Sequence, residues 1–174
     1  MLFRSGFHHR LWCRIVLWLL RHGDAADGSP DAERPLTDKG REQARAAGAA
    51  LKALGVELDA CLTSPKVRAA DTARIACEQL GEVEPQLEPK LAGGPFDPEA
   101  LAAGLGDEVL LVGHDPDFSM AVHDLTGAQV RMKKGGLAGV RRGELVVLLR
   151  PTDLKRIAAG ELQRSAATGD SAAD

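Results

Sequence analysis

The 174-residue chain contains no tyrosine and has only four phenylalanines and two tryptophans. Proteins that bind single-stranded nucleic acid stack its bases on aromatic side chains, so this scarcity argues against that class. The net charge of −3 provides no general attraction to nucleic acid or to anionic lipid. We therefore expect neither a nucleic acid nor a membrane as a partner.

Cysteine is also sparse, and the three residues Cys13, Cys61 and Cys77 form no CxxC pair. Without a spacing pattern they indicate neither a disulfide framework nor a zinc site, so we expect reduced thiols in a cytoplasmic protein without metal or other cofactor. The apolar run 11–20 is shorter than the about 20 residues that span a bilayer. It is interrupted by Arg14 and lacks a small-residue cleavage site, which argues against a signal peptide.

The length and composition of the chain fit one globular domain. With 44% hydrophobic and 27% charged residues, a chain of this length buries a sizeable core. We expect residues 1–13 to be an N-terminal extension that is either not native or disordered. The domain is predicted over residues 14–160, and the polar stretch 161–174 is predicted to be a disordered tail. A monomer is the default expectation.

Short apolar runs alternate with helical patterns, as is typical of a parallel sheet with helices on both faces. Strands are predicted over 15–20, 59–63, 83–87 and 108–112. Helices are predicted over 38–54, 65–80 and 116–125, and a short helix is predicted to begin at 98. Thr37 is the predicted N-cap of the first helix, while Ser64-Pro65 and Asp115-Pro116 predict cap-then-proline starts for two others. Segments 138–142 and 144–150 predict a closing antiparallel hairpin. The predicted fold is a single-domain three-layer α/β/α sandwich, its central sheet mostly parallel with an antiparallel edge.

Two histidines directly follow two of the apolar runs. Arg21-His22-Gly23 comes after the run 15–20, and Gly113-His114 comes after the run 109–112. Ligands of open α/β sheets lie beyond the carboxyl ends of the strands, so the two imidazoles meet if these strands are neighbours. Arg68 lies near the start of the second predicted helix, where the helix dipole also favours an anion. Guanidinium and imidazole groups at one edge predict a site for phosphate.

Four signatures, in this order along the chain, resemble those of the histidine phosphatase superfamily, whose fold is phosphoglycerate-mutase-like. They are Arg21-His22-Gly23-Asp24, then Arg34-Pro35-Leu36-Thr37, then Thr63-Ser64-Pro65 with Arg68-Ala69 and Thr72, and finally Gly113-His114. The compact chain and the Arg-Pro-Leu-Thr segment most resemble the bacterial SixA branch of phosphohistidine phosphatases.

The resemblance implies a metal-independent phosphatase in which His22 is the nucleophile and forms a covalent phosphohistidine intermediate. The expected catalytic residues are His22, Arg21, Arg68 and His114, and the expected substrate-binding residues are Arg34, Gly23, Ser64 and Lys134. Arg34 corresponds to an arginine of the SixA branch. Lys134 is expected at the rim of the pocket, although the Lys-Lys-Gly-Gly stretch around it is also typical of a solvated turn.

A general acid is harder to assign. Larger branches of the superfamily supply a glutamate between the second helix and the third strand, but no glutamate of residues 81–107 has the expected flanking pattern. Asp24 and Asp115 remain possible proton donors, and Asp115 could instead serve only as a helix cap. An alkoxide leaving group, with a conjugate-acid pKa of about 15.7 as a guide, needs a proton far more than imidazole at about 6.5. The difference is worth at most roughly 12 kcal/mol, which favours a phosphoramidate substrate.

These observations favour a phosphatase that removes phosphate from phosphohistidine on a partner protein. The chain has no large insertion that could form a lid, and an open site suits a protein side chain. Two alternatives stay open: a phosphomonoesterase acting on a small phosphorylated metabolite, and a non-catalytic phosphate-binding interaction module. The expected partner is therefore a phosphorylated protein or a small phosphorylated substrate.

Overall fold

The computed structural model describes residues 15–81 and 83–160, in which one sheet has the strand order β3-β2-β4-β1-β5-β6. The strands are β1 (Val16–Arg21), β2 (Ala60–Thr63), β3 (Gln86–Leu87), β4 (Glu108–Gly113), β5 (Leu137–Arg141) and β6 (Glu144–Leu149). β1, β4, β2 and β3 run parallel, and β5 is antiparallel to both β1 and β6. The predicted extension 1–13 and tail 161–174 lie outside the described residues.

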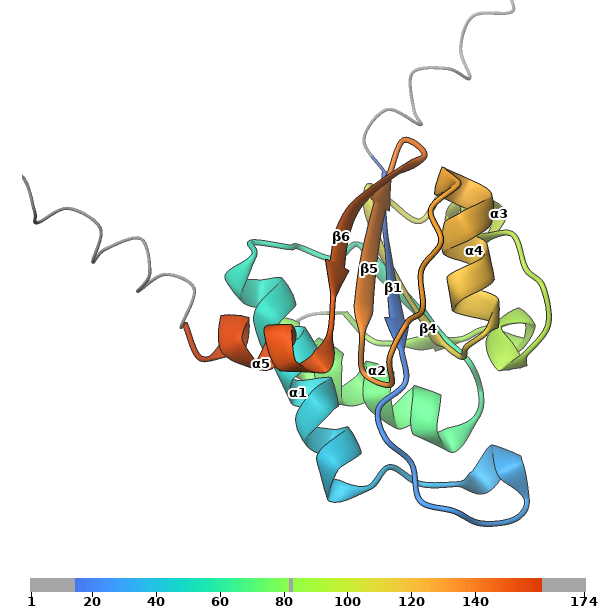
Figure 1. The fold of residues 1–174 in the computed structure, drawn as a ribbon, viewed down its shortest axis with the longest axis vertical. Coiled ribbons are helices and arrows are strands. Elements are labelled where there is room, and N and C mark those ends of the chain that lie inside the picture. The colour runs from blue at the N-terminus through green and yellow to red at the C-terminus, as the bar shows by residue number, and fades with distance from the viewer. Residues whose placement is uncertain (1–14, 82, 161–174) are drawn as a thin grey trace, which may run out of the picture.

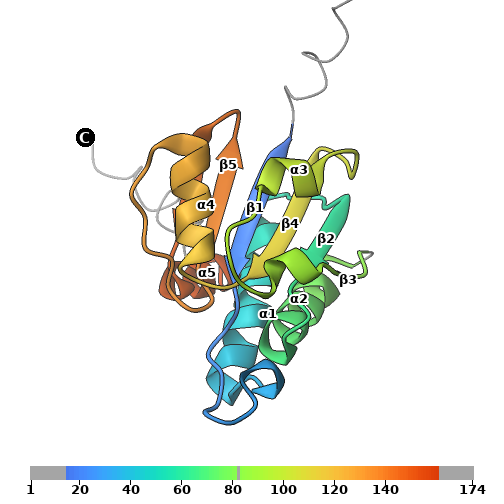
Figure 2. The same cartoon turned by 90° about the vertical axis from the view of Figure 1, so that its right-hand side faces the viewer.

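Helices cover both faces of the sheet (Figure 1). One face carries α1 (Asp38–Ala53), α2 (Val67–Leu80) and α5 (Pro151–Ala158), and the other carries α3 (Pro98–Ala102) and α4 (Asp117–Thr126). Figure 2 looks onto the face of α3 and α4, with β4 between β1 and β2 behind them. Two short 3-10 helices, η2 (Asp31–Glu33) and η3 (Pro89–Ala92), interrupt the loops. The predicted three-layer sandwich with a mostly parallel sheet is confirmed.

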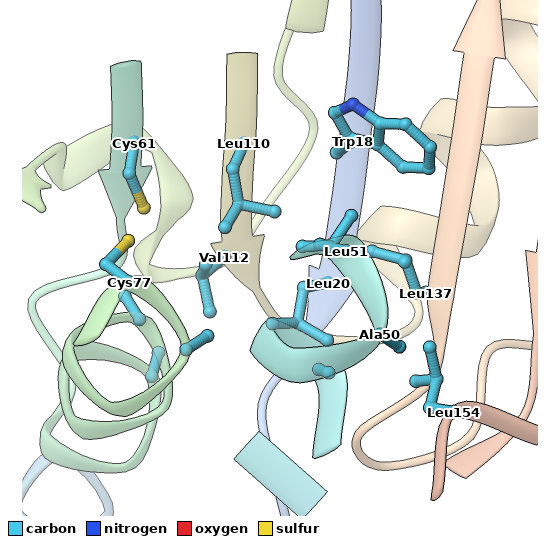
Figure 3. Packing of buried hydrophobic residues seen from close by; sticks show 14 of the residues in the cluster. Trp18, Leu20, Ala50, Leu51, Cys61, Cys77, Leu110, Val112, Leu137 and Leu154 are labelled. Atoms are coloured by element: carbon cyan, nitrogen blue, oxygen red, sulfur yellow. The ribbon is translucent and has the colours of Figure 1, made fainter. Parts of the chain in front are cut away.

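The central strands are continuously apolar because both of their faces are buried. Along β1, Trp18 and Leu20 face the layer of α1, α2 and α5, whereas Leu17 and Leu19 face the layer of α3 and α4. Figure 3 shows how Leu20 and its neighbours fill the first of these layers. Leu154 is fully buried there and anchors α5, a contribution of about 1.5–3 kcal/mol for one leucine.

The predicted start of the second helix was wrong by two residues. α2 begins at Val67 with Lys66 as its N-cap, instead of at Pro65 with Ser64 as the cap. The Ser64 hydroxyl accepts the Lys66 amide at 3.2 Å and lies 2.8 Å from Nε2 of His114. It is therefore engaged in a tight turn and in the histidine pair before the helix starts.

The second cap-then-proline start was wrong in the same way. Pro116 is the N-cap of α4, and the carboxylate of Asp115 accepts a hydrogen bond from the Ser119 hydroxyl instead of capping the helix. Thr37 is the N-cap of α1 as predicted, since its hydroxyl accepts the Gly40 amide at 3.1 Å. Three elements were not predicted at all: η2 within the first loop, η3 between β3 and α3, and α5 after the hairpin.

Candidate active site

The two histidines meet because their strands are neighbours. β1 pairs with β4 in parallel with Arg21 opposite Gly113, and the His22 amide donates to the Gly113 carbonyl at 3.0 Å. The imidazole centroids of His22 and His114 lie 5.0 Å apart, with the rings inclined by 57°. Each residue is 7% exposed. The predicted convergence of the two imidazoles at one edge of the sheet is confirmed.

The surroundings of His22 leave its Nε2 atom as an acceptor. Nδ1 lies 2.7 Å from the Gly23 carbonyl oxygen, which can only accept, so Nδ1 carries the proton. Nε2 accepts a hydrogen bond from Nε of Arg68 at 3.3 Å. Burial lowers the pKa of His22 to about 4; the Gly23 carbonyl opposes this shift, and the charge of Arg68 adds to it. At neutral pH the ring is uncharged, and its Nε2 lone pair is nucleophilic.

His114 is also held neutral. Its Nε2 atom lies 2.8 Å from the Ser64 hydroxyl, which can donate or accept according to the tautomer of the ring. Burial lowers the pKa of His114 to about 3, and the neighbouring His22 and Arg68 contribute further. The Ser64 hydroxyl therefore orients the ring, so that His114 faces His22 from the next strand.

Arg68 is the second residue of α2, and its buried side chain contacts the His22 imidazole, which follows β1. One turn later, Thr72 accepts the Gly23 amide at 3.1 Å and donates to the Arg68 carbonyl at 2.7 Å. These bonds tie the start of α2 to the loop after β1. They also engage the Gly23 amide, one of the groups that we expected to bind substrate, in an internal contact.

Glycine is required where the loop after β1 meets α1. A Cβ atom on Gly23 would lie 2.5 Å from the Gly40 carbonyl oxygen, and one on Gly40 would lie 2.0 Å from the Asp24 carbonyl oxygen. Any side chain at either position would push the first turn of α1 away from the loop. This close approach keeps the loop that begins with His22 packed against the first turn of α1.

Arg21 ends β1 and presents a buried donor. Its Nη1 atom donates to the Met132 carbonyl at 2.7 Å and lies 3.8 Å from the Asp115 carboxylate. Burial lowers the pKa of Arg21, with Asp115 opposing the shift. Its Nε atom is buried and has no hydrogen-bond partner among the described residues. The charge of Arg21 also contributes to the lowered pKa of His22. A buried donor of this kind suits an oxygen acceptor on a ligand.

The two remaining cations of the prediction lie farther out. Nε of Arg34 donates to the Ala26 carbonyl at 2.8 Å, and Nη1 donates to the Asp31 carboxylate at 3.2 Å. Lys134 is exposed, as expected of a rim residue, and pairs with Asp24 at 2.8 Å. The sequence analysis missed Asp31, which binds Arg34 and Arg68 at once. Its position after Pro30, and three residues before Arg34, is the only sequence signal for this role.

Both candidate proton donors are engaged as acceptors. Asp24 accepts from Lys134 at 2.8 Å and from the Thr37 hydroxyl at 3.0 Å, and these bonds, led by that of Lys134, lower the pKa of its carboxyl. Asp115 accepts the Ser119 hydroxyl and faces Arg21. In the segment between α2 and β4, the Glu88 carboxylate accepts the Lys90 amide at 2.9 Å and caps η3. Each of the three carboxylates thus accepts a hydrogen bond within the protein.

Within residues 15–81 and 83–160, no group of three or more His, Cys, Asp or Glu side chains is arranged to hold a metal ion. In the same residues, no helix has the length and apolar character needed to cross a bilayer.

An α/β sheet with two facing imidazoles and buried guanidinium groups at the carboxyl ends of its strands defines a phosphate-handling protein. The family model of the histidine phosphatase superfamily (branch 1) matches residues 17–94. An uncharacterized protein of Picosynechococcus sp. is 36% identical in an alignment of 142 residues that covers 74% of this chain and 86% of that protein. The chain belongs to the histidine phosphatase superfamily.

Two further relatives are phosphatases. The structure of the protein histidine phosphatase SixA complexed with tungstate is 25% identical, with a TM-score of 0.70 over 81% of this chain and 100% of that one. The mitochondrial serine/threonine-protein phosphatase Pgam5 of Drosophila ananassae is 41% identical over 63 residues, 36% of this chain and 22% of that protein. Together they support phosphatase activity as the class of reaction.

Proposed function

We propose that this protein is a metal-independent phosphatase that hydrolyses phosphohistidine on a partner protein, with His22 as the covalent nucleophile. The observation that carries the proposal is the pairing of a neutral, buried His22 with two candidate proton donors, Asp24 and Asp115, that are both engaged as acceptors. Such a site suits a leaving group that needs little protonation by the enzyme. Phosphohistidine meets this condition, and a phosphate ester does not.

In the first step the lone pair of His22 Nε2 forms a bond to phosphorus as the phosphorus–nitrogen bond of the substrate breaks. The substrate imidazole, protonated at its other nitrogen, leaves as a neutral ring. His22 becomes a cationic phosphohistidine that keeps its Nδ1 proton, and the Gly23 carbonyl stabilises that proton at 2.7 Å. No proton has to come from the enzyme.

In the second step a water molecule adds to phosphorus, and the electrons of the nitrogen–phosphorus bond return to Nε2. The product is dihydrogen phosphate, which loses a proton to solvent. Both steps transfer a phosphoryl group through a loose transition state whose charge is spread over three equatorial oxygens. Donors that are positioned in advance around those oxygens therefore supply most of the catalysis.

Arg21, Arg68 and His114 are these donors in the proposal. Nε of Arg68 bonds Nε2 of His22, Nε of Arg21 has no partner among the described residues, and His114 approaches from the adjacent strand. Guanidinium groups bind phosphoryl oxygens in a planar geometry and stay charged when buried. Ser64 orients His114, Lys134 attracts the substrate at the rim, and Arg34 acts through Asp31.

A protein substrate is supported by the packing of residues 81–107, which lie between α2 and β4. Leu91 and Ala102 from this segment are buried in the layer of α3 and α4, and Phe96 packs on Phe118 with ring centroids 5.5 Å apart. Residues 91–102 of this segment are thus packed onto a face of the sheet. We infer that a segment packed in this way leaves the histidine pair accessible to a phosphorylated side chain of another protein.

The test is to compare hydrolysis of a phosphohistidine-bearing protein domain with hydrolysis of a panel of phosphate monoesters. We expect a strong preference for the phosphohistidine substrate. We also expect a radiolabelled phosphoenzyme that is stable in alkali and labile in acid. His22→Ala should lose both turnover and labelling, whereas His123→Ala, which changes an exposed histidine of α4, should keep them.

Two results would overturn the proposal. Full turnover by His22→Ala would show that His22 is not the nucleophile. A higher kcat/KM for one of the monoesters than for the phosphohistidine protein would move the function to a small-molecule phosphomonoesterase. Absence of turnover on every substrate, with phosphate binding intact, would favour the non-catalytic binding module.

A further inference from the structure

Three cationic side chains converge on the carboxylate of Asp31. Its Oδ2 atom accepts from Nη2 of Arg68 at 3.0 Å and from Nζ of Lys66 at 3.1 Å, and its Oδ1 atom accepts from Nη1 of Arg34 at 3.2 Å. These bonds, led by that of Arg68, hold the pKa of the Asp31 carboxyl far below its usual range. A phosphoryl group is bound by the same type of donors.

The contact with Arg68 lies at the edge of its guanidinium that faces the nucleophile. In arginine, Nε and Nη2 share one edge, and this edge grips a phosphoryl group through two parallel bonds. Here Nε donates to Nε2 of His22, and Nη2 donates to Oδ2 of Asp31. Each nitrogen of this edge therefore already has an acceptor within the protein. A phosphoryl group that is attacked by His22 takes over the N–H of Nε and also needs an N–H of Nη2, the nitrogen at which the negatively charged Asp31 carboxylate already lies.

We propose that the Asp31 carboxylate competes with the phosphoryl group for Nη2 of Arg68. The phosphoryl group displaces the carboxylate when substrate binds, and the carboxylate displaces the phosphoryl group when product leaves. The inference rests on the proposed phosphatase function and assigns a residue that sets the affinity of its phosphoryl site. Asp31 belongs to none of the signatures that placed the chain in its family.

The remaining contacts let the carboxylate leave while Arg68 stays in place. Nη1 of Arg68 donates to the backbone carbonyl of Asp31 at 2.6 Å, a bond that does not involve the carboxylate. The Asp31 side chain is 54% exposed, whereas that of Arg68 is 7% exposed. Asp31 begins η2, a single turn without buried residues. A rotation of the Asp31 side chain toward solvent therefore frees Nη2 without moving the guanidinium.

Competition of this kind weakens the binding of the product more than it slows the reaction. Inorganic phosphate has to break the Asp31 contact to enter, and Asp31 re-forms the contact as phosphate leaves. Because phosphate no longer has to displace a charged acceptor, removal of the carboxylate charge is expected to tighten phosphate binding about tenfold.

The experiment measures the Kd of inorganic phosphate by isothermal titration calorimetry at pH 7.5, in the wild type and in Asp31→Asn. The substitution keeps the shape of the side chain and removes its charge. We expect the Kd of phosphate, and its inhibition constant as a product, to fall about tenfold in the variant. A matched control is Asp27→Asn, because Asp27 is a fully exposed acid of the same loop, 3.6 Å from Nη2 of Arg34. The control should change the Kd by less than about threefold, as is typical of exposed ion pairs.

The result separates competition from a merely positioning role for Asp31. If the carboxylate served chiefly to hold Arg68, Asp31→Asn would raise the Kd of phosphate and lower kcat. A raised or unchanged Kd in this variant overturns the inference, as does an equal fall in Asp27→Asn. Asp31→Ala provides a second measurement with the same expected direction.

Failure of the proposed function gives a different pattern. Tighter phosphate binding by Asp31→Asn, together with absence of phosphohistidine hydrolysis in the wild type, supports the competitor and refutes the phosphatase. Hydrolysis by the wild type, with unchanged phosphate binding in the variant, supports the phosphatase and refutes the competitor role of Asp31.

Discussion

The imidazole rings of His22 and His114 lie 5.0 Å apart in a buried pair, and the pKa of each is lowered, to about 4 and about 3. In the unfolded chain both would titrate near 6.5. Between pH 6.5 and pH 4 the unfolded chain therefore binds protons that the folded protein does not. Stability should rise with pH through this window, and acidification should cost up to about 3 kcal/mol for His22 alone.

Urea unfolding of the wild type and of His114→Gln at pH 7 and at pH 4.5 measures this contribution. The free energy of unfolding should fall less between the two pH values in the variant, because the variant titrates one buried imidazole fewer. The comparison between proteins cancels Glu108, whose pKa is raised by burial and whose contribution has the opposite sign. Parallel profiles in the two proteins would show that His114 has an ordinary pKa.

Removal of the guanidinium of Arg68 should impair the reaction more than the fold. Arg68→Ala is expected to lower kcat/KM by a factor of about 10²–10³, the cost of losing one preorganised donor to the transition state, about 3–4 kcal/mol. Arg74→Ala is the matched control, since Arg74 lies on the same helix but pairs with Glu78 at the surface. Steady-state kinetics on the phosphohistidine substrate decides, and equal rates for the two variants would place Arg68 outside the reaction.

The parts of the fold that could be predicted from the sequence are those with a local cause. The apolar runs before His22 and His114 predicted two central strands, and their pairing follows from the parallel topology. The starts of α2 and α4 were misplaced because Ser64 and Asp115 are good caps locally, but they bond His114 and Ser119 instead. Tertiary partners of a polar side chain do not show in local sequence patterns.

The residues of the candidate site also divide into those that local sequence patterns could predict and those that they could not. Strand ends and the start of a helix identified His22, His114 and Arg68 as neighbours, because backbone topology alone brings them together. Asp31 could not be identified, because its role depends on η2 turning its carboxylate toward α2. The polar loop before α1 has no periodicity that predicts such a turn.

Chelation of metal ions should leave the activity unchanged. In the proposed mechanism the charge on the phosphoryl oxygens is neutralised by Arg21 and Arg68, whose charges do not depend on a bound ion. Turnover of the phosphohistidine substrate with and without EDTA, after prior dialysis against the chelator, measures this. Loss of activity that is restored by adding a divalent cation would contradict the proposal.

The contact between Ser64 and His114 predicts a moderate effect on rate. Ser64→Ala removes the hydroxyl that orients the ring, and a net hydrogen bond of this kind contributes about 0.5–1.5 kcal/mol. We expect kcat to fall about threefold to tenfold, with the melting temperature nearly preserved. Ser119→Ala serves as a control for loss of a hydroxyl, because Ser119 bonds Asp115 instead of a histidine. An unchanged kcat in Ser64→Ala would mean that other contacts orient His114.

The close approach of Gly40 to the loop after β1 predicts that Gly40→Ala lowers the stability of the protein, whereas the same substitution usually stabilises a helix. In an unconstrained helix, replacement of glycine by alanine stabilises by about 1 kcal/mol. At Gly40 the new Cβ would lie 2.0 Å from the Asp24 carbonyl oxygen, a backbone atom, so we expect Gly40→Ala to destabilise by about 1–3 kcal/mol.

Thermal unfolding measures the effect, and 1 kcal/mol corresponds to about 2–4 °C in a protein of this size. Gly28→Ala is the control from the neighbouring loop, where the nearest atom to a new Cβ is Cγ of the Arg34 side chain at 3.8 Å. Because the displaced loop carries His22, Gly40→Ala should also lose phosphatase activity at temperatures where it is still folded. A stabilised, fully active Gly40→Ala would show that α1 and the histidine loop are free to separate.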